Sequence, residues 1–438
     1  MKFSIITLGC KVNAYESQYY AGQLEELGYE QVSPEQPCDI CIINTCTVTN
    51  TAASKSRQKI HYAKRMNPNA LCVVVGCFVQ FANEEERKAL DADLVIGAKQ
   101  KNELVKLIQQ ALNEHEKIDV VNEVTQFKDF EAMPVHCFES MHRAFLKVQD
   151  GCNQFCSYCA IPIITGRHVS RPMEEILQEV RYLVDRGVKE FQIIAQELTY
   201  YGVDLYHKQM LPELVERIAD IPGVEWIRLH YAYPAHFPTD LFRVMRERPN
   251  VCKYMDIALQ HISDNMLQKM RRHVTKEQTY QLIENFRKEV PGIHLRTTLM
   301  VGHPGETEAD FEELKEFVRK VRFDRMGAFA YSEEEGTFAA NNYEDNISQE
   351  VKQARLDELM AIQQEISSEL SAAKIGRQMK VIIDRVEGDY YIGRTEFDSP
   401  EVDPEVLIER NGKQLIIGNF YQVEIVNSDD FDLYGRII

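Results

Sequence analysis

The stretch Val148-Gln-Asp-Gly-Cys152-Asn-Gln-Phe-Cys156-Ser-Tyr-Cys159 organises the interpretation of the whole chain. It follows an apolar run, Phe145–Val148, and its three cysteines have the spacing C-x3-C-x2-C. Three thiolates in one loop can hold three irons of a [4Fe–4S] cluster and leave the fourth iron open to a small ligand. Structural zinc usually takes four protein ligands, and the nearest further candidate, His168, lies outside the loop. Structural zinc and unliganded buried cysteines are the alternatives.

Strand-like and helix-like segments alternate outward from this loop, from Ala144 to about Val321. Six apolar runs with strand character, interspersed with amphipathic segments, predict a full or partial parallel βα barrel. In such folds functional groups gather at the carboxyl ends of strands, where the cysteine loop would lie. The predicted strands are Phe145–Val148, Phe191–Ile194, Trp226–Leu229, Met255–Ala258, Leu295–Met300 and Met326–Tyr331.

The first 115 residues show a shorter version of the same alternation, typical of a parallel, doubly wound α/β sheet. The predicted strands are Phe3–Thr7, Ile40–Asn44, Cys72–Val75 and Leu94–Ile96, and the predicted helices are Ala21–Leu27, Lys55–Met66 and Lys101–Leu112. Residues 116–142 lose this rhythm and are interpreted as a connector. The predicted organisation is therefore an N-terminal domain over 1–120, a linker over 121–142 and a barrel core over 143–373. The core would end in a long helix, Gln349–Ala373.

The last 65 residues, 374–438, change character. Short β-rich runs separated by Gly, Asp, Asn and Pro predict a small antiparallel β barrel. The predicted strands are Lys380–Ile383, Tyr390–Arg394, Val406–Glu409, Tyr421–Ile425 and Leu433–Ile437.

Composition excludes several classes of protein. No run of eighteen apolar residues suggests a membrane span, and the N-terminus lacks a basic leader, so a cytoplasmic protein is expected. Its net charge of −18 argues against sequence-independent binding to nucleic acid. Eleven cysteines in a reducing compartment favour metal ligands, catalytic groups or buried small residues over disulfides.

A second set of cysteines lies in the N-terminal domain. Cys10, Cys46 and Cys77 each follow one of the predicted strands. Parallel strands of one sheet bring their carboxyl ends to the same edge, where open α/β folds bind ligands. Three cysteines at that edge predict another cluster with an open iron. The alternative is that they are only small residues at strand ends.

The central triad resembles the radical S-adenosylmethionine superfamily. With the N-terminal cysteines and the terminal barrel, the chain resembles the methylthiotransferase family from end to end. That resemblance implies two [4Fe–4S] clusters, S-adenosylmethionine as cofactor and a terminal barrel named TRAM. It further implies that the cluster at Cys152, Cys156 and Cys159 cleaves S-adenosylmethionine to a radical. The N-terminal cluster would carry the sulfur that is methylated and transferred to carbon.

Further residues are candidates for binding the cofactor. Gln196 and Glu197 follow the second barrel strand, where superfamily members contact the methionine amino group. Gln260 and His261, which follow Tyr254–Leu259, and Arg296 are weaker candidates, and Arg296 could pair with the cofactor carboxylate. Each could instead be an ordinary polar residue at a strand end. Tyr200, Tyr201, Tyr231 and Tyr233 could line a substrate mouth.

Two subgroup likenesses disagree about the substrate. Residues 1 to about 156, including Thr7–Asn13 and Asn44–Asn50, resemble enzymes that modify threonylcarbamoyladenosine beside the tRNA anticodon. From about Ala160 onward, including Ile161–Arg167 and Ala328–Gly336, the chain resembles enzymes that modify an aspartate of a small-subunit ribosomal protein. A mixed chain would explain the split.

Charge favours the protein substrate. The terminal barrel has eight Lys and Arg against thirteen Asp and Glu, whereas a tRNA-binding barrel should be basic. The expected partners are therefore the ribosomal protein or, as the alternative, tRNA, together with an electron donor and a sulfur source. Two other classes stay open: a radical enzyme whose N-terminal cluster donates no sulfur, and a non-catalytic zinc-bound adaptor.

Overall fold

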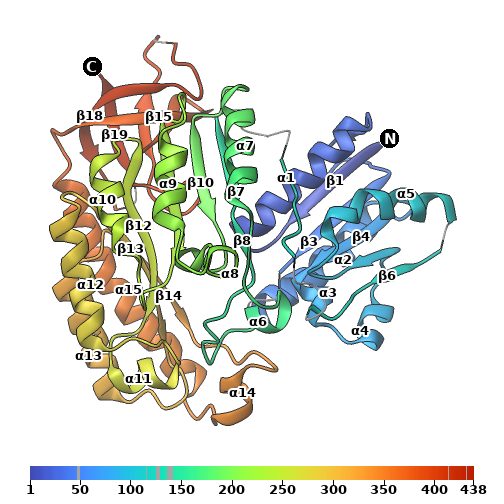
Figure 1. The fold of residues 1–438 in the computed structure, drawn as a ribbon, viewed down its shortest axis with the longest axis horizontal. Coiled ribbons are helices and arrows are strands. Elements are labelled where there is room, and N and C mark those ends of the chain that lie inside the picture. The colour runs from blue at the N-terminus through green and yellow to red at the C-terminus, as the bar shows by residue number, and fades with distance from the viewer. Residues whose placement is uncertain (47–49, 115, 125–128, 136–141, 413, 431) are drawn as a thin grey trace.

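The computed structural model describes residues 1–438 apart from 47–49, 115, 125–128, 136–141, 413 and 431. Three bodies follow one another along the chain (Figure 1): an N-terminal α/β sheet, a central α/β core and a small barrel that contains the C-terminus. Cys137 and part of the predicted linker lie outside the described residues. Among the helices that the structure describes, none is long and apolar enough to cross a membrane.

The N-terminal sheet is parallel throughout, in the order β2-β1-β3-β4-β5-β6. Its strands are β1 (Lys2–Thr7), β2 (Glu30–Gln31), β3 (Ile40–Thr45), β4 (Leu71–Gly76), β5 (Leu94–Ile96) and β6 (Ile118–Val120). The helices are α1 (Lys11–Glu26), α2 (Asn50–Met66), α3 (Cys77–Phe81), α4 (Glu84–Ala89) and α5 (Leu104–Glu114). The prediction that the rhythm stops at residue 116 is wrong by one strand, since β6 extends the sheet.

Side chains that alternate along the strands pack against helices on both faces. Ile42 and Val73 pack with α1 and α5 on one face, whereas Ile43 and Val74 pack with α2 on the other. The doubly wound sheet predicted from the sequence is confirmed. Cys41 and Cys72 lie in the second of these cores, as expected of small apolar residues.

The central core contains a six-stranded parallel sheet in the order β14-β13-β12-β11-β10-β7, which leaves β7 and β14 as edges. It is the predicted partial barrel. Its strands are β7 (Arg143–Lys147), β10 (Glu190–Ile194), β11 (Trp226–Ala232), β12 (Val251–Gln260), β13 (His294–Val301) and β14 (Arg325–Ala330). The two short strands β8 (Gln149–Asp150) and β9 (Val169–Ser170) pair with each other beside it.

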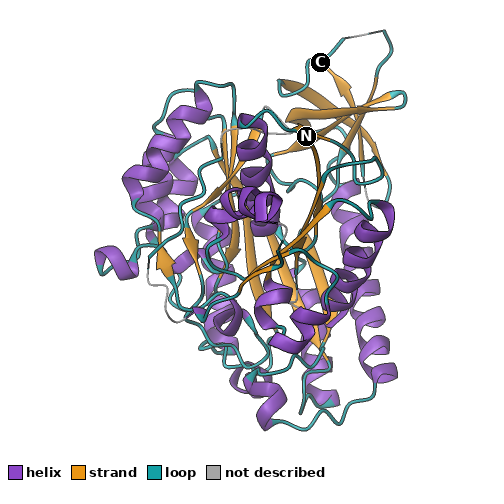
Figure 2. Ribbon diagram, turned by 90° about the vertical axis from the view of Figure 1, so that its right-hand side faces the viewer, coloured by secondary structure: helices purple, strands orange, loops and turns teal. Residues whose placement is uncertain are grey.

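Helices cover the outside of this sheet (Figure 2), and their apolar faces share one large core with the strands. They are α7 (Met173–Val184), α9 (Leu211–Ala219), α10 (Asp240–Glu247), α12 (Lys276–Glu289), α13 (Glu308–Val321) and α15 (Gln349–Ala372). Shorter helices lie in the connections: α6 (Ile161–Ile164), α8 (Val203–Tyr206), α11 (Asp264–Lys269) and α14 (Phe338–Asn342).

The C-terminal body is a closed five-stranded barrel in the order β15-β16-β17-β19-β18. Its strands are β15 (Gln378–Glu387), β16 (Tyr390–Thr395), β17 (Val406–Glu409), β18 (Phe420–Ser428) and β19 (Leu433–Ile437). The predicted antiparallel barrel is correct for four of the pairings. The exception is the pairing of β17 with β19, which is parallel.

The barrel docks on the core through buried ion pairs. Arg394 of β16 donates to both carboxylate oxygens of Glu190 at 2.7 and 3.1 Å and also binds Asp384. The side chains of Glu190, Arg228 and Arg394 are nearly inaccessible to solvent. The loop after β16 enters the core, where Asp398 binds Arg325 and Asp403 accepts from Tyr254 at 2.8 Å. This loop reaches the cavity described next.

Candidate active site

One cavity of about 730 Å³ lies where the three bodies meet. Residues from each body line it, and they include eight of the ten residues predicted as site residues: Cys10, Cys152, Cys156, Cys159, Gln196, Glu197, Gln260 and Arg296. Cys46 and Cys77, the other two, are buried and do not line the cavity; Cys46 lies against Gly9, next to Cys10 in the chain. Eight of the ten predicted residues therefore face one common cavity.

The central cysteines occupy the loop after β7 and β8, at the carboxyl end of the core sheet. Cys156 is buried, and Cys152 and Cys159 are partly exposed to the cavity. Burial raises the pKa of the Cys159 thiol to about 12 and raises that of Cys152 further. A positive centre is therefore needed to hold these sulfurs as thiolates, and iron would supply it.

Arg272 is a basic group already in contact with this loop. Its Nη1 donates to the Sγ of Cys156 and to the hydroxyl of Tyr158, each at 3.2 Å, and the side chain is almost fully buried. Tyr233 donates to the carbonyl of Arg272 at 2.8 Å and lies 3.7 Å from the same Sγ. Hydrogen bonds to the sulfurs are among the features that set the potential of a cluster.

The three N-terminal cysteines follow adjacent strands, as predicted. Cys10 ends the connection from β1 to α1, Cys46 follows β3, and Cys77 is the first residue of α3 after β4. A Cβ built on Gly9 would lie 2.8 Å from the Cβ of Cys46 and 3.0 Å from its Sγ, so the ends of β1 and β3 nearly touch there. Glycine also meets the positive φ of 107° at this position.

Paired amides brace this edge of the sheet. Asn13 Nδ2 donates to Asn44 Oδ1 at 3.1 Å, and Asn44 Nδ2 donates to the Asn13 carbonyl at 2.9 Å. Asn13 Oδ1 in turn accepts from the backbone N–H of Cys10 at 3.3 Å. Among the described residues, no three Cys, His, Asp or Glu side chains converge as the ligands of a single metal ion do. A cluster does not require such convergence, because each thiolate binds a different iron.

A buried network of charges joins the two cysteine sets. Lys101 donates to Glu16 at 2.8 Å, Lys147 lies 3.7 Å from Glu16 and 2.9 Å from Asp150, and Lys99 lies 4.0 Å from Asp150. Burial alone would lower the pKa of Lys101, but Glu16 and the Cys77 thiol outweigh it and raise the pKa. Three lysines against two carboxylates leave an excess positive charge in this network, and its Lys101 partly opposes the rise that burial causes in the pKa of the Cys77 thiol.

The candidate cofactor residues differ in how many of their hydrogen-bonding atoms already have a partner. Gln196 donates to Asp150 at 3.2 Å, but its Oε1 has no partner within the part of the chain that the structure describes. The buried Oε1 of Gln260 is unpaired in the same sense. Glu197 instead caps the turn Leu198–Tyr200 by accepting from Thr199 N at 2.7 Å, and Gln154 donates to its other oxygen at 3.3 Å. The two glutamines thus offer unoccupied acceptors.

Arg296 and the other weaker candidates are largely committed elsewhere. Arg296 lines the cavity but binds Asp256 at 3.0 Å and Asp403 at 3.4 Å. His261 is fully buried between Glu306 and the Ser263 N–H and is not among the cavity residues. Tyr231 and Tyr233 line the cavity, whereas Tyr201 is a core residue and Tyr200 packs on His168.

Several cavity residues were not predicted. Lys11, Arg272, Phe329, Glu401 and Val402 all line the wall, the last two from the loop of the terminal barrel. Lys11 donates to the carbonyl of Pro400 at 3.3 Å and so links the N-terminal body to that loop. The run of three basic residues after α11, Arg271–His273, is the sequence signal that could have indicated a basic group near the site.

Comparison with known proteins identifies the three bodies. Residues 146–318 match the radical SAM superfamily, residues 2–97 match the uncharacterized protein family UPF0004, and residues 375–438 match the TRAM domain. The fold resembles solved radical S-adenosylmethionine enzymes. TsrM from Kitasatospora setae has a TM-score of 0.54 at 15% identity, with 75% of this chain and 74% of that chain covered. OxsB has a TM-score of 0.50 at 13% identity, with 81% and 56% covered.

Curated relatives match the chain over its whole length. The ribosomal protein uS12 methylthiotransferases RimO of Bacteroides fragilis and Bacteroides thetaiotaomicron are 64% and 63% identical, and cover 99% and 100% of this chain and 98% of their own. RimO of Flavobacterium johnsoniae is 43% identical over 99% of this chain and 98% of its own. Since these matches include the first 156 residues, the N-terminal likeness to tRNA-modifying enzymes does not require a mixed chain. The chain belongs to the RimO family of radical S-adenosylmethionine methylthiotransferases.

Proposed function

We propose that this enzyme replaces a hydrogen on the β-carbon of an aspartate in ribosomal protein uS12 with a methylthio group. The observation that carries the proposal is the single cavity that Cys10 shares with Cys152, Cys156 and Cys159. A sulfur-donating cluster and a radical-generating cluster must act on one substrate carbon, so their ligands must face a common space. The names of the full-length relatives supply the substrate.

The residues present fit two [4Fe–4S] clusters and S-adenosylmethionine. Cys152, Cys156 and Cys159 would hold one cluster, and Cys10, Cys46 and Cys77 the other. When bound, these groups would supply the radical that removes hydrogen from the substrate and the methylated sulfur that replaces it. The buried thiols, which need a cation to ionise, and the excess charge around Lys101 support this assignment.

The protein's own residues would bind and orient S-adenosylmethionine, stabilise a cluster ligand and exclude water. The unpaired Oε1 atoms of Gln196 and Gln260 would accept hydrogen bonds from the ammonium of S-adenosylmethionine. Arg272 would stabilise the cluster ligand Cys156 through its hydrogen bond. The walls around the cavity, including the apolar Phe329 and Val402, would keep water away from a reactive carbon.

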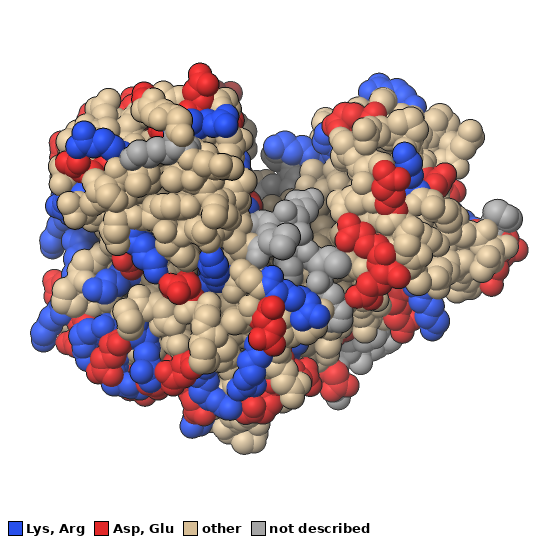
Figure 3. All heavy atoms as spheres, turned by 90° about the horizontal axis from the view of Figure 1, so that it is seen from above, with Lys and Arg blue, Asp and Glu red and all other residues tan. Residues whose placement is uncertain are grey.

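Charge supports a protein rather than tRNA as the substrate. The TRAM barrel is acidic, and one face of the molecule shows acidic and basic side chains interspersed without a continuous basic surface (Figure 3). Phosphate contacts dominate affinity for nucleic acid, so a tRNA-binding barrel should be basic. Modification of threonylcarbamoyladenosine in tRNA is the alternative.

The decisive test is anaerobic turnover of the cluster-loaded enzyme with uS12 and, separately, with tRNA, each analysed by mass. We expect the mass of uS12 to rise by that of a methylthio group less one hydrogen, and tRNA to be unchanged. A gain on tRNA alone would overturn the substrate. Zinc in place of iron, with no brown absorbance, would instead favour the zinc-bound adaptor.

Cysteine variants separate a donor cluster from one that only relays electrons. Cys46→Ala should remove iron from the N-terminal site and abolish sulfur transfer, while S-adenosylmethionine is still cleaved reductively. Cys156→Ala should abolish that cleavage. Cys252→Ala, which changes a buried cysteine of the interface between core and barrel, is the matched control and should retain both activities. Sulfur transfer by Cys46→Ala would show that the N-terminal cluster is not the donor.

A further inference from the structure

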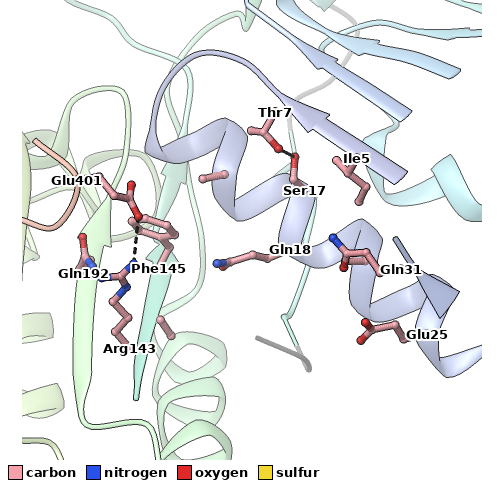
Figure 4. Close-up of a pocket in the computed structure, with 13 residues that line it drawn as sticks. Ile5, Thr7, Ser17, Gln18, Glu25, Gln31, Arg143, Phe145, Gln192 and Glu401 are labelled. Carbon is pink, nitrogen blue, oxygen red and sulfur yellow. Dashed lines mark hydrogen bonds and ion pairs between the residues drawn. The ribbon is translucent and has the colours of Figure 1, made fainter. Parts of the chain in front are cut away.

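A second cavity, of about 300 Å³, lies between α1 and the edge of the core sheet (Figure 4). Its size is at the lower end of the range for ligand sites, about 300–1,000 Å³. One face of α1 lines it opposite β7 and β10, which contribute Phe145 and Gln192. It shares Thr7, Ala14 and Glu401 with the reaction cavity. The two cavities therefore adjoin at these three residues.

Two glutamine side chains carry unpaired amide atoms at this cavity. Gln192 is 1% exposed, and neither its Nε2 nor its Oε1 has a hydrogen-bond partner among the described residues. The buried Oε1 of Gln18 is unpaired within the same part of the chain. Figure 4 shows Gln18 extending from α1 toward β7. Burying amide atoms without partners is unfavourable by about 1–3 kcal/mol, so such atoms call for a ligand or a function.

Four further polar side chains at the cavity are already paired. Thr7 donates to Ser17 at 2.8 Å, and Arg143 donates to Glu401 at 3.1 Å. Among the described residues, the buried lining atoms without a partner are thus one NH₂ and two carbonyl oxygens. An anion would leave the two oxygens unpaired, and a cation would leave the NH₂ unpaired. A ligand with both N–H and C=O groups, which is to say an amide, satisfies all of them.

We infer that this cavity is an amide-binding subsite for the backbone of the substrate polypeptide next to the residue that is modified. The inference rests on the proposed function, which makes the substrate a polypeptide. An extended chain offers an N–H and a C=O at every residue, and its neighbouring residues would occupy the two adjoining cavities. Gln192 and Gln18 are then positioning residues, which hold the target residue in the reaction cavity without touching the reacting atoms.

The test compares Gln192→Leu with the wild type, both with clusters loaded under anaerobic conditions. The probe is a synthetic uS12 peptide that spans the target aspartate, and its Kd is measured by fluorescence anisotropy. We expect the Kd to rise about tenfold, as for the loss of one or two buried hydrogen bonds. Cleavage of S-adenosylmethionine without peptide should be unchanged. The melting temperature should be equal or higher, because the variant removes a buried amide that has no partner.

Gln23→Leu is the matched control, since Gln23 lies on the same helix but outside both cavities and pairs with Glu26. It should bind the peptide as the wild type does. An unchanged Kd for Gln192→Leu would show that the cavity holds water only, and weaker binding of S-adenosylmethionine would make it a cofactor subsite. A lower melting temperature would make Gln192 a structural amide. Each result overturns the inference while leaving the proposed function intact. If the wild type neither binds nor modifies uS12, both fail together.

Discussion

Glu190 is the centre of the ion pairs that dock the TRAM barrel on the core, and its replacement by Gln tests how that docking is held. Burial would raise the pKa of this carboxyl, but the guanidinium groups of Arg394 and Arg228 outweigh burial and lower the pKa to about 2. Each pKa unit corresponds to about 1.4 kcal/mol, so the fall from the ordinary value of 4.5 corresponds to about 3 kcal/mol. Removing one partner of a buried pair typically costs about 3–5 kcal/mol, which agrees.

Trp226, the single tryptophan of the chain, provides the assay. Its ring centroid lies 4.8 Å from that of Phe420 in the barrel, so its fluorescence should report when the barrel separates from the core. In urea at pH 7, we expect Glu190→Gln to lower the midpoint of this transition by about 1 M or more, for a slope of about 1–3 kcal/mol per M. Glu225→Gln is the control: it breaks an exposed pair with Lys380 across the same interface, worth less than about 1 kcal/mol.

The pH dependence gives the reasoning a second test. Because the folded pKa of Glu190 is lowered, its contribution is fully present above about pH 4.5 and is lost as the pH falls toward 2. The difference between wild type and Glu190→Gln should therefore shrink over that range. Equal midpoints for Glu190→Gln and Glu225→Gln at pH 7 would refute the view that the buried centre holds the barrel in place.

Three further predictions concern the cysteine sites. Lys101→Met removes a buried positive charge beside Cys77 and should lower the reduction potential of the N-terminal cluster by tens of millivolts in an EPR titration. Lys106→Met, which changes an exposed lysine of α5, should leave that potential unchanged. Arg272→Met removes the hydrogen bond to Cys156 and should lower the potential of the other cluster and slow cleavage of S-adenosylmethionine; an unchanged potential would show that this bond does not tune it. Gly9→Ala forces a Cβ against Cys46 and should roughly halve the iron content, because one of the two clusters would be lost. Gly28 also has a positive φ but has open space around it, so Gly28→Ala should lose only about 1 kcal/mol of stability and no iron.

The three bodies and both cysteine sets could be predicted from the sequence because each is encoded locally. Strand runs such as Ile40–Asn44 and Leu94–Ile96 were placed to within one residue, since buried parallel strands are continuously apolar. To predict that Cys10, Cys46 and Cys77 lie at one edge of the sheet, it was enough to know that parallel strands of one sheet end at the same edge. The parallel pairing of β17 with β19 depends on how the barrel closes, and local sequence carries no signal for it.

The first half of α1 was missed for a different physical reason. The prediction began this helix at Ala21, but the structure begins it at Lys11. Lys11, Asn13, Glu16 and Ser17 are buried beside Val12, Tyr15 and Tyr19, so polar side chains interrupt the buried face of the helix and mask its apolar periodicity. Each of these side chains is used: Asn13 braces the strand ends, Glu16 binds Lys101, Ser17 accepts from Thr7, and Lys11 holds the TRAM loop.

The same explanation holds for the inner face of the core sheet, where Glu190, Gln192 and Arg228 are fully or almost fully buried. Such positions contradict hydrophobic patterning and cost stability unless they are paired, so a fold keeps them only where they do something else. Glu190 and Arg228 are paired by the barrel. Gln192 has no partner among the residues described, on the wall of a cavity that adjoins the reaction site. Buried polar atoms without a partner can thus be recognised only in the folded structure, and those of Gln192 indicate where the substrate chain should lie.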